Sequence, residues 1–409
     1  MIHLAGTFDF SNPYVLIMGA SLIVILSYFF NIIADRTNIP SVLLLILTGI
    51  LLELALGHYG VSHGELMSSL EILGIVGLIM IVLEAALDLQ LTKEKLPLIG
   101  KSLLIALLCL LASTFGIALV IQQFIVMEFT VAMLYATPLS IMSSAIIIPS
   151  VSSLILEKKE FMVYESAFSD IVGIMQFYFI ISLLESDGAT ASLQFGGSLL
   201  ITIVVAVVAS YALVFFFKDI KGHIRLFLLI AILLLLYAGG KLLHLSPLLI
   251  ILIFGLAMAN HRRAFKIFRN SLVEEENDPI EKIEKEFHLI TLETAFVVRT
   301  FFFVVFGMTI DLGALVSWDV FIISAAVLLI LYVVRFVFLR GLLGKDMLPE
   351  LWIAPRGLIT ILLFFAIPAV YENEAFSNGI LLYVIIISSL IMTAALIGGK
   401  GQKVAEAID

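Results

Sequence analysis

The sequence has little charge and almost no cysteine. Charged residues make up 13% of its 409 positions and apolar residues 62%, and the mean hydropathy is +1.17. This composition lies far outside the range of soluble globular proteins and predicts a chain embedded in a lipid bilayer. The single cysteine, Cys109, lies in an apolar run, so a disulfide framework within one chain is excluded.

Catalytic motifs are also missing from the apolar part of the chain. The spans contain no His-Glu-x-x-His, Ser-His-Asp or cysteine and histidine arrangement of the kind that enzymes use. A membrane enzyme is therefore the least favoured class, and the sequence calls for no cofactor and no nucleic acid.

Long apolar runs are abundant, and each is about the length that a helix needs to cross a bilayer. Charged or turn-rich segments separate about thirteen of them. The predicted spans lie at 12–33, 39–57, 69–88, 98–124, 129–156, 161–183, 194–217, 224–241, 245–260, 287–311, 317–343, 348–370 and 378–398.

Basic residues fall almost entirely on one side of these spans. Cytoplasmic loops collect lysine and arginine, and with the N-terminus outside the cytoplasmic connections hold 19 of the 23 basic residues. Lys241 falls on the other side, and Arg299, Arg335 and Arg356 fall inside spans. The pattern predicts thirteen spans in the inner (cytoplasmic) membrane, with the N-terminus outside and the C-terminus in the cytoplasm.

Two spans contain helix breakers. The span at 129–156 is interrupted near Pro138 and the span at 348–370 near Pro355. Irregular backbone at membrane depth is tolerated only where it is buried in protein or lines a cavity, although each proline alone would also fit a simple kink. The two spans are seven apart in order, so they run in opposite directions, as an inverted repeat requires. The sequence therefore predicts an all-α polytopic membrane protein with inverted repeats and two interrupted, crossing helices.

The span after the first break carries two carboxylates, although a charge at the middle of a span costs roughly 2.5 to 3.5 kcal/mol on insertion scales. Ser166, Ser169, Asp170 and Gly173 follow the i, i+3, i+4, i+7 spacing of one helical stripe. Glu165 precedes Asp170 by five residues, which places the two carboxylates about 140° apart around the helix. One carboxylate can thus be neutralised by a fixed cation while the other stays available.

We expect Glu165 to be the structural carboxylate and Asp170 the working one. Arg356 is the arginine near the middle of the other interrupted span. An ion pair between Glu165 and Arg356 would offset the cost of burying both charges. The alternatives are a structural hydrogen bond to a neighbouring helix for Asp170 and a different acidic partner for Arg356.

These residues resemble those of a known family. The hexapeptide "ESAFSD" is similar to the Glu-Ser-x-x-Asn-Asp signature of cation/proton antiporters of the sodium/proton exchanger type, and "APRGLIT" resembles their Arg-Gly motif. Weaker matches occur in the spans at 39–57, 69–88, 245–260 and 287–311. The resemblance implies a core domain at about 98–183 and 317–398, which moves against a dimerisation domain at about 12–88 and 224–311. The helix at about 194–217 would link them, and the protein would form a homodimer in the bilayer.

The resemblance also implies roles for single residues. Asp170 matches the aspartate that binds a monovalent cation and a proton, Ser166 a side-chain ligand, and Glu165 with Arg356 the bracing ion pair. Ser169 and Thr137 stand at further site positions. Glu84 matches an acid that helps to hold the cation in some members, and it also fits an ordinary glutamate at the cytoplasmic edge. Arg299 would brace unwound backbone or helix dipoles.

Two departures from the family pattern bear on the substrate. Ser169 stands where the family has asparagine, and Ala136-Thr137-Pro138 stands where it often has Thr-Asp-Pro. The site thus lacks an amide and an acid that the relatives have, and both are groups that contact the cation. Relatives with two adjacent aspartates carry two protons per cation, and Ser169 cannot titrate, so we expect electroneutral exchange.

The sequence therefore predicts a transporter that exchanges Na⁺, or else Li⁺ or K⁺, for H⁺ by alternating access and that serves pH homeostasis. Cation and proton would compete for Asp170. Two other classes remain open. An ion channel would share the polar breaks but would usually use a ring of carbonyls or acids, and a symporter or a sensor would share the inverted-repeat fold.

Overall fold

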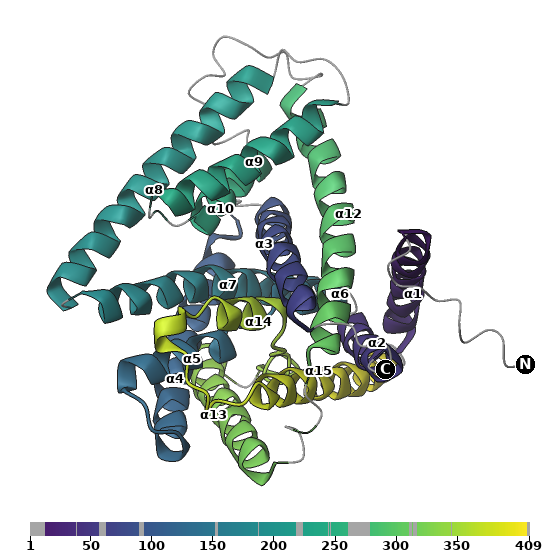
Figure 1. The fold of residues 1–409 in the computed structure, drawn as a ribbon, viewed down its shortest axis with the longest axis vertical. Helices are drawn as coiled ribbons and strands as arrows, with labels where there is room; N and C mark the ends of the chain where they lie inside the picture. The colour runs from purple at the N-terminus through teal and green to yellow at the C-terminus, as the bar shows by residue number, and fades with distance from the viewer. Residues whose placement is uncertain are drawn as a thin grey trace, which may run out of the picture.

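The described part of the chain is entirely helical, turn or irregular, without a strand (Figure 1). A computed structural model describes residues 13–37, 39–56, 63–89, 94–151, 154–186, 188–217, 224–243, 245, 247–260, 279–310, 313, 317–344 and 346–406. The helices are α1 (Pro13–Thr37), α2 (Ser41–Leu56), α3 (His63–Asp88), α4 (Leu96–Phe124), α5 (Phe129–Ser140), α6 (Ser144–Ser150), α7 (Leu156–Glu185), α8 (Gly188–Phe217), α9 (Ile224–Leu242), α10 (Pro247–Ala259), α12 (Pro279–Met308), α13 (Trp318–Leu342), α14 (Leu358–Phe365) and α15 (Gly379–Glu406), with a 3₁₀ turn at Ala369–Tyr371.

Eleven of the thirteen predicted spans each coincide with one helix, the span at 129–156 coincides with the pair α5 and α6, and the span at 348–370 contains only the short helix α14 and the start of the 3₁₀ turn. Among the described residues, eight helical segments are long and apolar enough to cross a membrane, and α2, α9, α10 and the second part of α3 are shorter apolar helices. The predicted all-α polytopic fold is confirmed. Several basic residues used for orientation, Arg262 and Arg263 among them, lie outside the described residues.

Sequence features explain where the helices begin and what their outer faces contact. Proline stands at the first position of α1, α10 and α12, where its missing N–H costs no helical hydrogen bond. On α8, Leu200, Val204 and Val208 follow one another at intervals of four and are all exposed. Such an apolar stripe is what a lipid-facing helix presents.

The helices pack as two groups, and α7, which belongs to the first group, also contacts α3 and α10 of the second (Figure 1). In one group, α4 packs on α5, α7 and α13, and α13 packs on α15; in the other, α12 packs on α2 and α3, and α10 packs on α3 and α9. Helix α8 contacts α7 of the first group and α10 of the second. The groups contain the segments assigned above to the core and dimerisation domains, and their relative movement stays a prediction.

Helices α2 and α12 touch through their backbones. A Cβ atom on Gly49 would lie 2.1 Å from the carbonyl oxygen of Val304 and 2.8 Å from the Cα of Gly307. Small residues permit this approach, which is a common way of packing helices in a membrane. Any larger side chain at Gly49 or Gly307 would force α2 and α12 apart.

Both predicted interruptions are present. Residues 141–143 separate α5 from α6. The second differs from a helix with a kink, because residues 348–352 form turns, 353–357 are irregular, and the only α-helix within the predicted span at 348–370 is α14. Pro355 favours an extended residue before it, and Arg356 binds carbonyl groups of its surroundings, so no continuous helix forms through this segment.

Candidate functional site

The two interrupted segments cross and bind each other through their backbones. The N–H of Ser143 donates to the carbonyl of Pro355 at 2.9 Å. Gly357 approaches the first break so closely that a Cβ on it would lie 2.6 Å from Ser143 Oγ. A side chain at position 357 would therefore push the two broken segments apart at the point where they meet.

Asp170 faces this crossing from α7. The residue is 4% exposed, and its Oδ2 accepts a hydrogen bond from the hydroxyl of Ser144, the first residue of α6. Its other carboxylate oxygen, Oδ1, is buried without a hydrogen-bond partner in the protein. An unpartnered buried carboxylate oxygen is costly. A proton or a cation bound to Oδ1 would remove this cost.

Ser169 holds the first break rather than facing Asp170's oxygens. Its Oγ accepts a hydrogen bond from the N–H of Met142 at 3.0 Å. This bond satisfies a backbone donor that the broken helix leaves open. Ser169 thus fixes the break against α7 and, through it, the position of Ser144 two residues further on.

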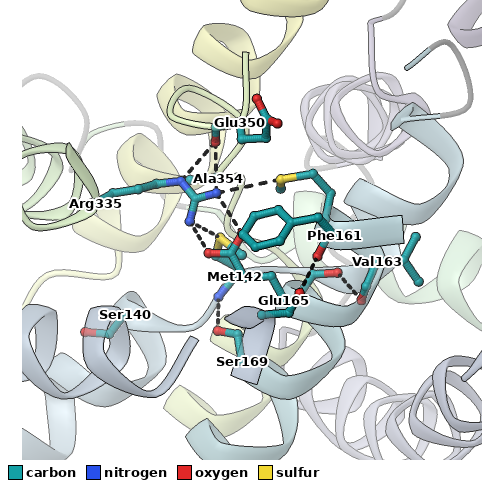
Figure 2. Close-up of polar contacts among 12 residues, drawn as sticks. Ser140, Met142, Phe161, Val163, Glu165, Ser169, Arg335, Glu350 and Ala354 are labelled. Atoms are coloured by element: carbon teal, nitrogen blue, oxygen red, sulfur yellow. Dashed lines mark hydrogen bonds and ion pairs between the residues drawn. The ribbon is translucent and has the colours of Figure 1, made fainter. Parts of the chain in front are cut away.

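The bracing ion pair differs from the predicted one (Figure 2). Glu165 is fully buried, and Arg335 of α13 binds it with both ends of the guanidinium, Nη1 to Oε1 at 2.5 Å and Nη2 to Oε2 at 2.9 Å. Two parallel bonds of this kind are the strongest geometry for an arginine and a carboxylate. The predicted pairing of Glu165 with Arg356 is therefore corrected to Glu165 with Arg335.

Arg356 binds backbone instead of a carboxylate. Its Nε donates to the carbonyl of Leu139 at 3.0 Å and its Nη2 to the carbonyl of Ser140 at 3.2 Å, while Nη1 donates to the carbonyl of Ala354. Leu139 and Ser140 end α5, where helix carbonyls lack partners within the helix. Arg356 is thus a cation placed at a helix C-terminus, and this explains why it needs no acidic partner.

Glu165 and both arginines nevertheless lie close together. Together with Ser140, Met142 and Ser169 they line one buried gap of about 10 Å³, which is about the room for one water molecule. Arg356 therefore lies near Glu165, as predicted, but the ion-pair partner of Glu165 is Arg335.

Arg299 of α12 connects α3 with α6. Its Nη1 donates to the carbonyl of Ala145 at 2.9 Å, and its Nη2 lies 3.7 Å from Glu84 Oε2. Ala145 follows Ser144, the residue that binds Asp170. Arg299 thus braces α6, the short helix after the break. Glu84, which is on α3, lies beside this arginine.

Two predicted ligands have their hydroxyl groups bonded elsewhere. Ser166 donates to the carbonyl of Val163 at 3.2 Å within α7. Thr137 donates to the carbonyl of Met133 at 2.8 Å and accepts from the amide of Gln176 at 3.4 Å. Their roles as ion ligands stay predictions.

The sequence alone revealed no roles for Arg335, Ser144 or Gln176. Arg335 was visible as one of three arginines inside spans, and Ser144 as one of the serines of the first broken span. Gln176 follows Asp170 by six residues on α7 and is 8% exposed. No sequence signal distinguished it from an ordinary core amide.

A cavity of about 210 Å³ lies between α1, α2, α6 and α12. Polar side chains in its wall include Asn31, Ser41, Ser150, Arg299 and Thr300. Its wall also includes Ala145, the neighbour of Ser144. The cavity therefore ends one residue from the group that binds Asp170.

Broken helices that cross at a buried carboxylate, in a helical membrane protein, define a secondary transporter fold of the inverted-repeat class. The sodium/hydrogen exchanger transmembrane family matches residues 21–402. The chain belongs to this family, which is one of transporters that exchange cations for protons rather than of enzymes. The resemblance drawn from the motifs is confirmed.

Two solved structures share the fold. A structure of the sodium proton antiporter MjNhaP1 from Methanocaldococcus jannaschii at pH 8 matches with a TM-score of 0.69 and 19% identity over 94% of this chain and 99% of that one. A structure of MjNhaP1 from an electron-microscopy map matches with a TM-score of 0.64 and 21% identity over 94% and 95%. No curated protein sequence matches.

Proposed function

We propose that the chain is a secondary active antiporter in which a monovalent cation, with Na⁺ the favoured substrate, and a proton compete for Asp170. The observation that carries the proposal is the buried Oδ1 of Asp170, which has no protein partner at the crossing of the two breaks. Burial opposes the charged carboxylate, and a bound cation favours it. One site therefore holds either a cation or a proton, and it needs no cofactor.

The position of the site supports alternating access. Asp170 and α6 belong to the group of α4, α7 and α13, whereas the other walls of the cavity are α1, α2 and α12. In our proposal the cavity is the aqueous route from the cytoplasm to Asp170, and it closes when the first group moves against the second. If the transporter changes easily between the two states only when Asp170 holds a cation or a proton, exchange of cation for proton is obligatory.

The remaining parts of the proposal concern the setting of the protein in the cell. The distribution of basic residues supports an N-terminus outside and a cytoplasmic C-terminus in the inner membrane. Family membership supports a homodimer through the group of α2, α3 and α12. The gradient of protons would then drive sodium out and contribute to pH homeostasis.

The proposal predicts cation-dependent proton movement in everted membrane vesicles. NaCl, LiCl and KCl are added in turn to vesicles with a preformed pH gradient, and dequenching of a pH-sensitive dye reports proton release. We expect a response to NaCl, because the chain belongs to the sodium/hydrogen exchanger family. A folded protein that gives no response to any of the three salts would sink the proposal, and cation flux without proton release would favour a channel.

We further predict that exchange is electroneutral, one cation for one proton. Four acids are buried among the described residues, and three of them have a cation beside them. Glu165 is bound by Arg335, Glu84 lies 3.7 Å from Arg299, and Glu350 lies 3.1 Å from Lys158. Asp170 is then the acid that binds the cation and the proton in turn. Proteoliposomes with a fixed sodium gradient are given a potassium diffusion potential with valinomycin, and the rate and endpoint of exchange should not respond to it.

The control for this experiment is Glu84→Gln. If Glu84 carries a second proton, the potential will accelerate exchange in the unmodified protein, and Glu84→Gln will remove that acceleration. This outcome would contradict one-for-one exchange and would name Glu84 as the second carrier.

A further inference from the structure

A buried ion pair stands at the start of α7, outside the site described above. Lys158 Nζ lies 3.1 Å from Glu350 Oε1 and 2.6 Å from Asp346 Oδ1. The side chain of Glu350 is 3% exposed and that of Asp346 is 82% exposed. A buried carboxylate needs a cation near it, and Lys158 is that cation for Glu350. The pair joins α7 to the turn ahead of the second break.

Glu350 also binds the bracing arginine through its backbone (Figure 2). Its carbonyl oxygen accepts hydrogen bonds from Arg335 Nε at 3.0 Å and from Nη2 at 2.8 Å. The same residue is therefore held by Lys158 through its side chain and holds Arg335 through its carbonyl. A shift of Glu350 would move Arg335, because a guanidinium fork is rigid and directional.

Arg335 in turn contacts the first break. Its Nη1 lies 3.3 Å from the sulfur of Met142, and the N–H of Met142 donates to Ser169 of α7. Met142 stands two residues before Ser144, whose hydroxyl binds Asp170. A continuous series of contacts thus runs from Lys158 at the start of α7, through Glu350 and Arg335, to the hydroxyl that orients the working carboxylate.

We propose that Lys158 and Glu350 are positioning residues for the ion site, acting through Arg335 and the first break. The inference rests on the proposed function, since it concerns how well Asp170 binds the transported cation. Loss of the pair lets Glu350 and Arg335 shift, and Ser144 then no longer fits Asp170 as well. The titrating carboxylate remains, so the transporter still cycles when the cation is saturating, but it needs more cation to do so.

The test compares Lys158→Met and Glu350→Gln with the unmodified protein in everted vesicles, over a series of NaCl concentrations. We expect the apparent KM for Na⁺ to rise by between about 2-fold and about 30-fold, the range found for residues along a coupled network. The maximal rate per folded transporter should be retained. Lys158→Arg keeps the charge and should restore the KM.

Two further variants distinguish positioning from a loss of surface charge. Lys159→Met removes the neighbouring charge on α7 and should leave the KM unchanged. Asp346→Asn removes the exposed carboxylate partner of Lys158 and should change the KM less than Glu350→Gln does, because the buried carboxylate is the one next to the arginine. Folded yield and unfolding temperature are measured for every variant.

An unchanged KM in folded Lys158→Met, or an equal rise in Lys159→Met, would overturn the inference whatever happens to the yield. Should Lys158→Met not reach the membrane, Glu350→Gln decides, since it keeps the shape of the side chain and much of its hydrogen bonding. If the unmodified protein shows no exchange, the proposed function has failed. If it exchanges normally and the variants match its KM, only the positioning role has failed.

Discussion

Asp170→Asn should abolish cation-dependent proton release while leaving the protein folded in the membrane. The amide keeps the shape of the side chain and can still accept the hydrogen bond from Ser144, but it has no charge to attract a cation and no proton to exchange. Asp170 is buried and its Oδ1 has no protein partner, so loss of the charge removes an unfavourable group and should not unfold α7. Dequenching with NaCl should fall to the level of vesicles without the protein.

A matched control is Glu185→Gln, which removes an exposed carboxylate at the end of the same helix. It should exchange at the unmodified rate. Substantial antiport by folded Asp170→Asn, at any pH tested, would contradict the proposal that this carboxylate binds both the cation and the proton. Size-exclusion chromatography in detergent shows whether the variant is folded.

The second large effect is expected from breaking the ion pair between Glu165 and Arg335. Either single substitution, Glu165→Leu or Arg335→Met, leaves an uncompensated charge at a site that is almost completely buried. Breaking a buried pair in this way costs about 3 to 5 kcal/mol, a large share of the stability of a folded domain. Folded yield and unfolding temperature in detergent should drop sharply for both variants.

The double variant Glu165→Leu, Arg335→Met decides whether these two residues are partners. With both charges gone, the desolvation cost is also gone, so the double variant should be clearly more stable than either single one. Glu165→Leu combined with Arg356→Met serves as the control, because Arg356 binds carbonyl groups instead of Glu165. If the control pair recovers stability and the Arg335 pair does not, the assignment of partners is wrong.

Much of the fold followed from apolar run lengths, because a bilayer imposes a nearly fixed length on each span. The break near Pro138 was also predictable, since proline removes a backbone donor and its position is visible in the sequence. Less visible was the extent of the second break. Residues 353–357 are irregular. Arg356, within this segment, binds the carbonyl of Leu139 and the hydroxyl of Ser388, groups far away along the chain.

The site shows the same limit. Asp170 was predictable from a local stripe of polar residues on one helix. The partner of Glu165 was not, because three arginines lie inside spans and their distance from Glu165 depends on how α7, α13 and the second break pack. Arg356 lines the same small gap as Glu165, so spatial proximity alone would still have suggested the wrong pair. Only the orientation of each guanidinium distinguishes a carboxylate partner from a helix end.

The contact between Gly49 and Gly307 has a consequence for the 210 Å³ cavity. It fixes α2 against α12, and a hydrogen bond of 2.6 Å between the hydroxyls of Ser27 and Thr300 fixes α1 against α12 as well. Three of the four walls, α1, α2 and α12, are therefore bound to one another. In the proposed movement of the first group, the cavity would change its shape at the fourth wall, α6, and the hydrogen bond from Arg299 to Ala145 would be the contact that breaks.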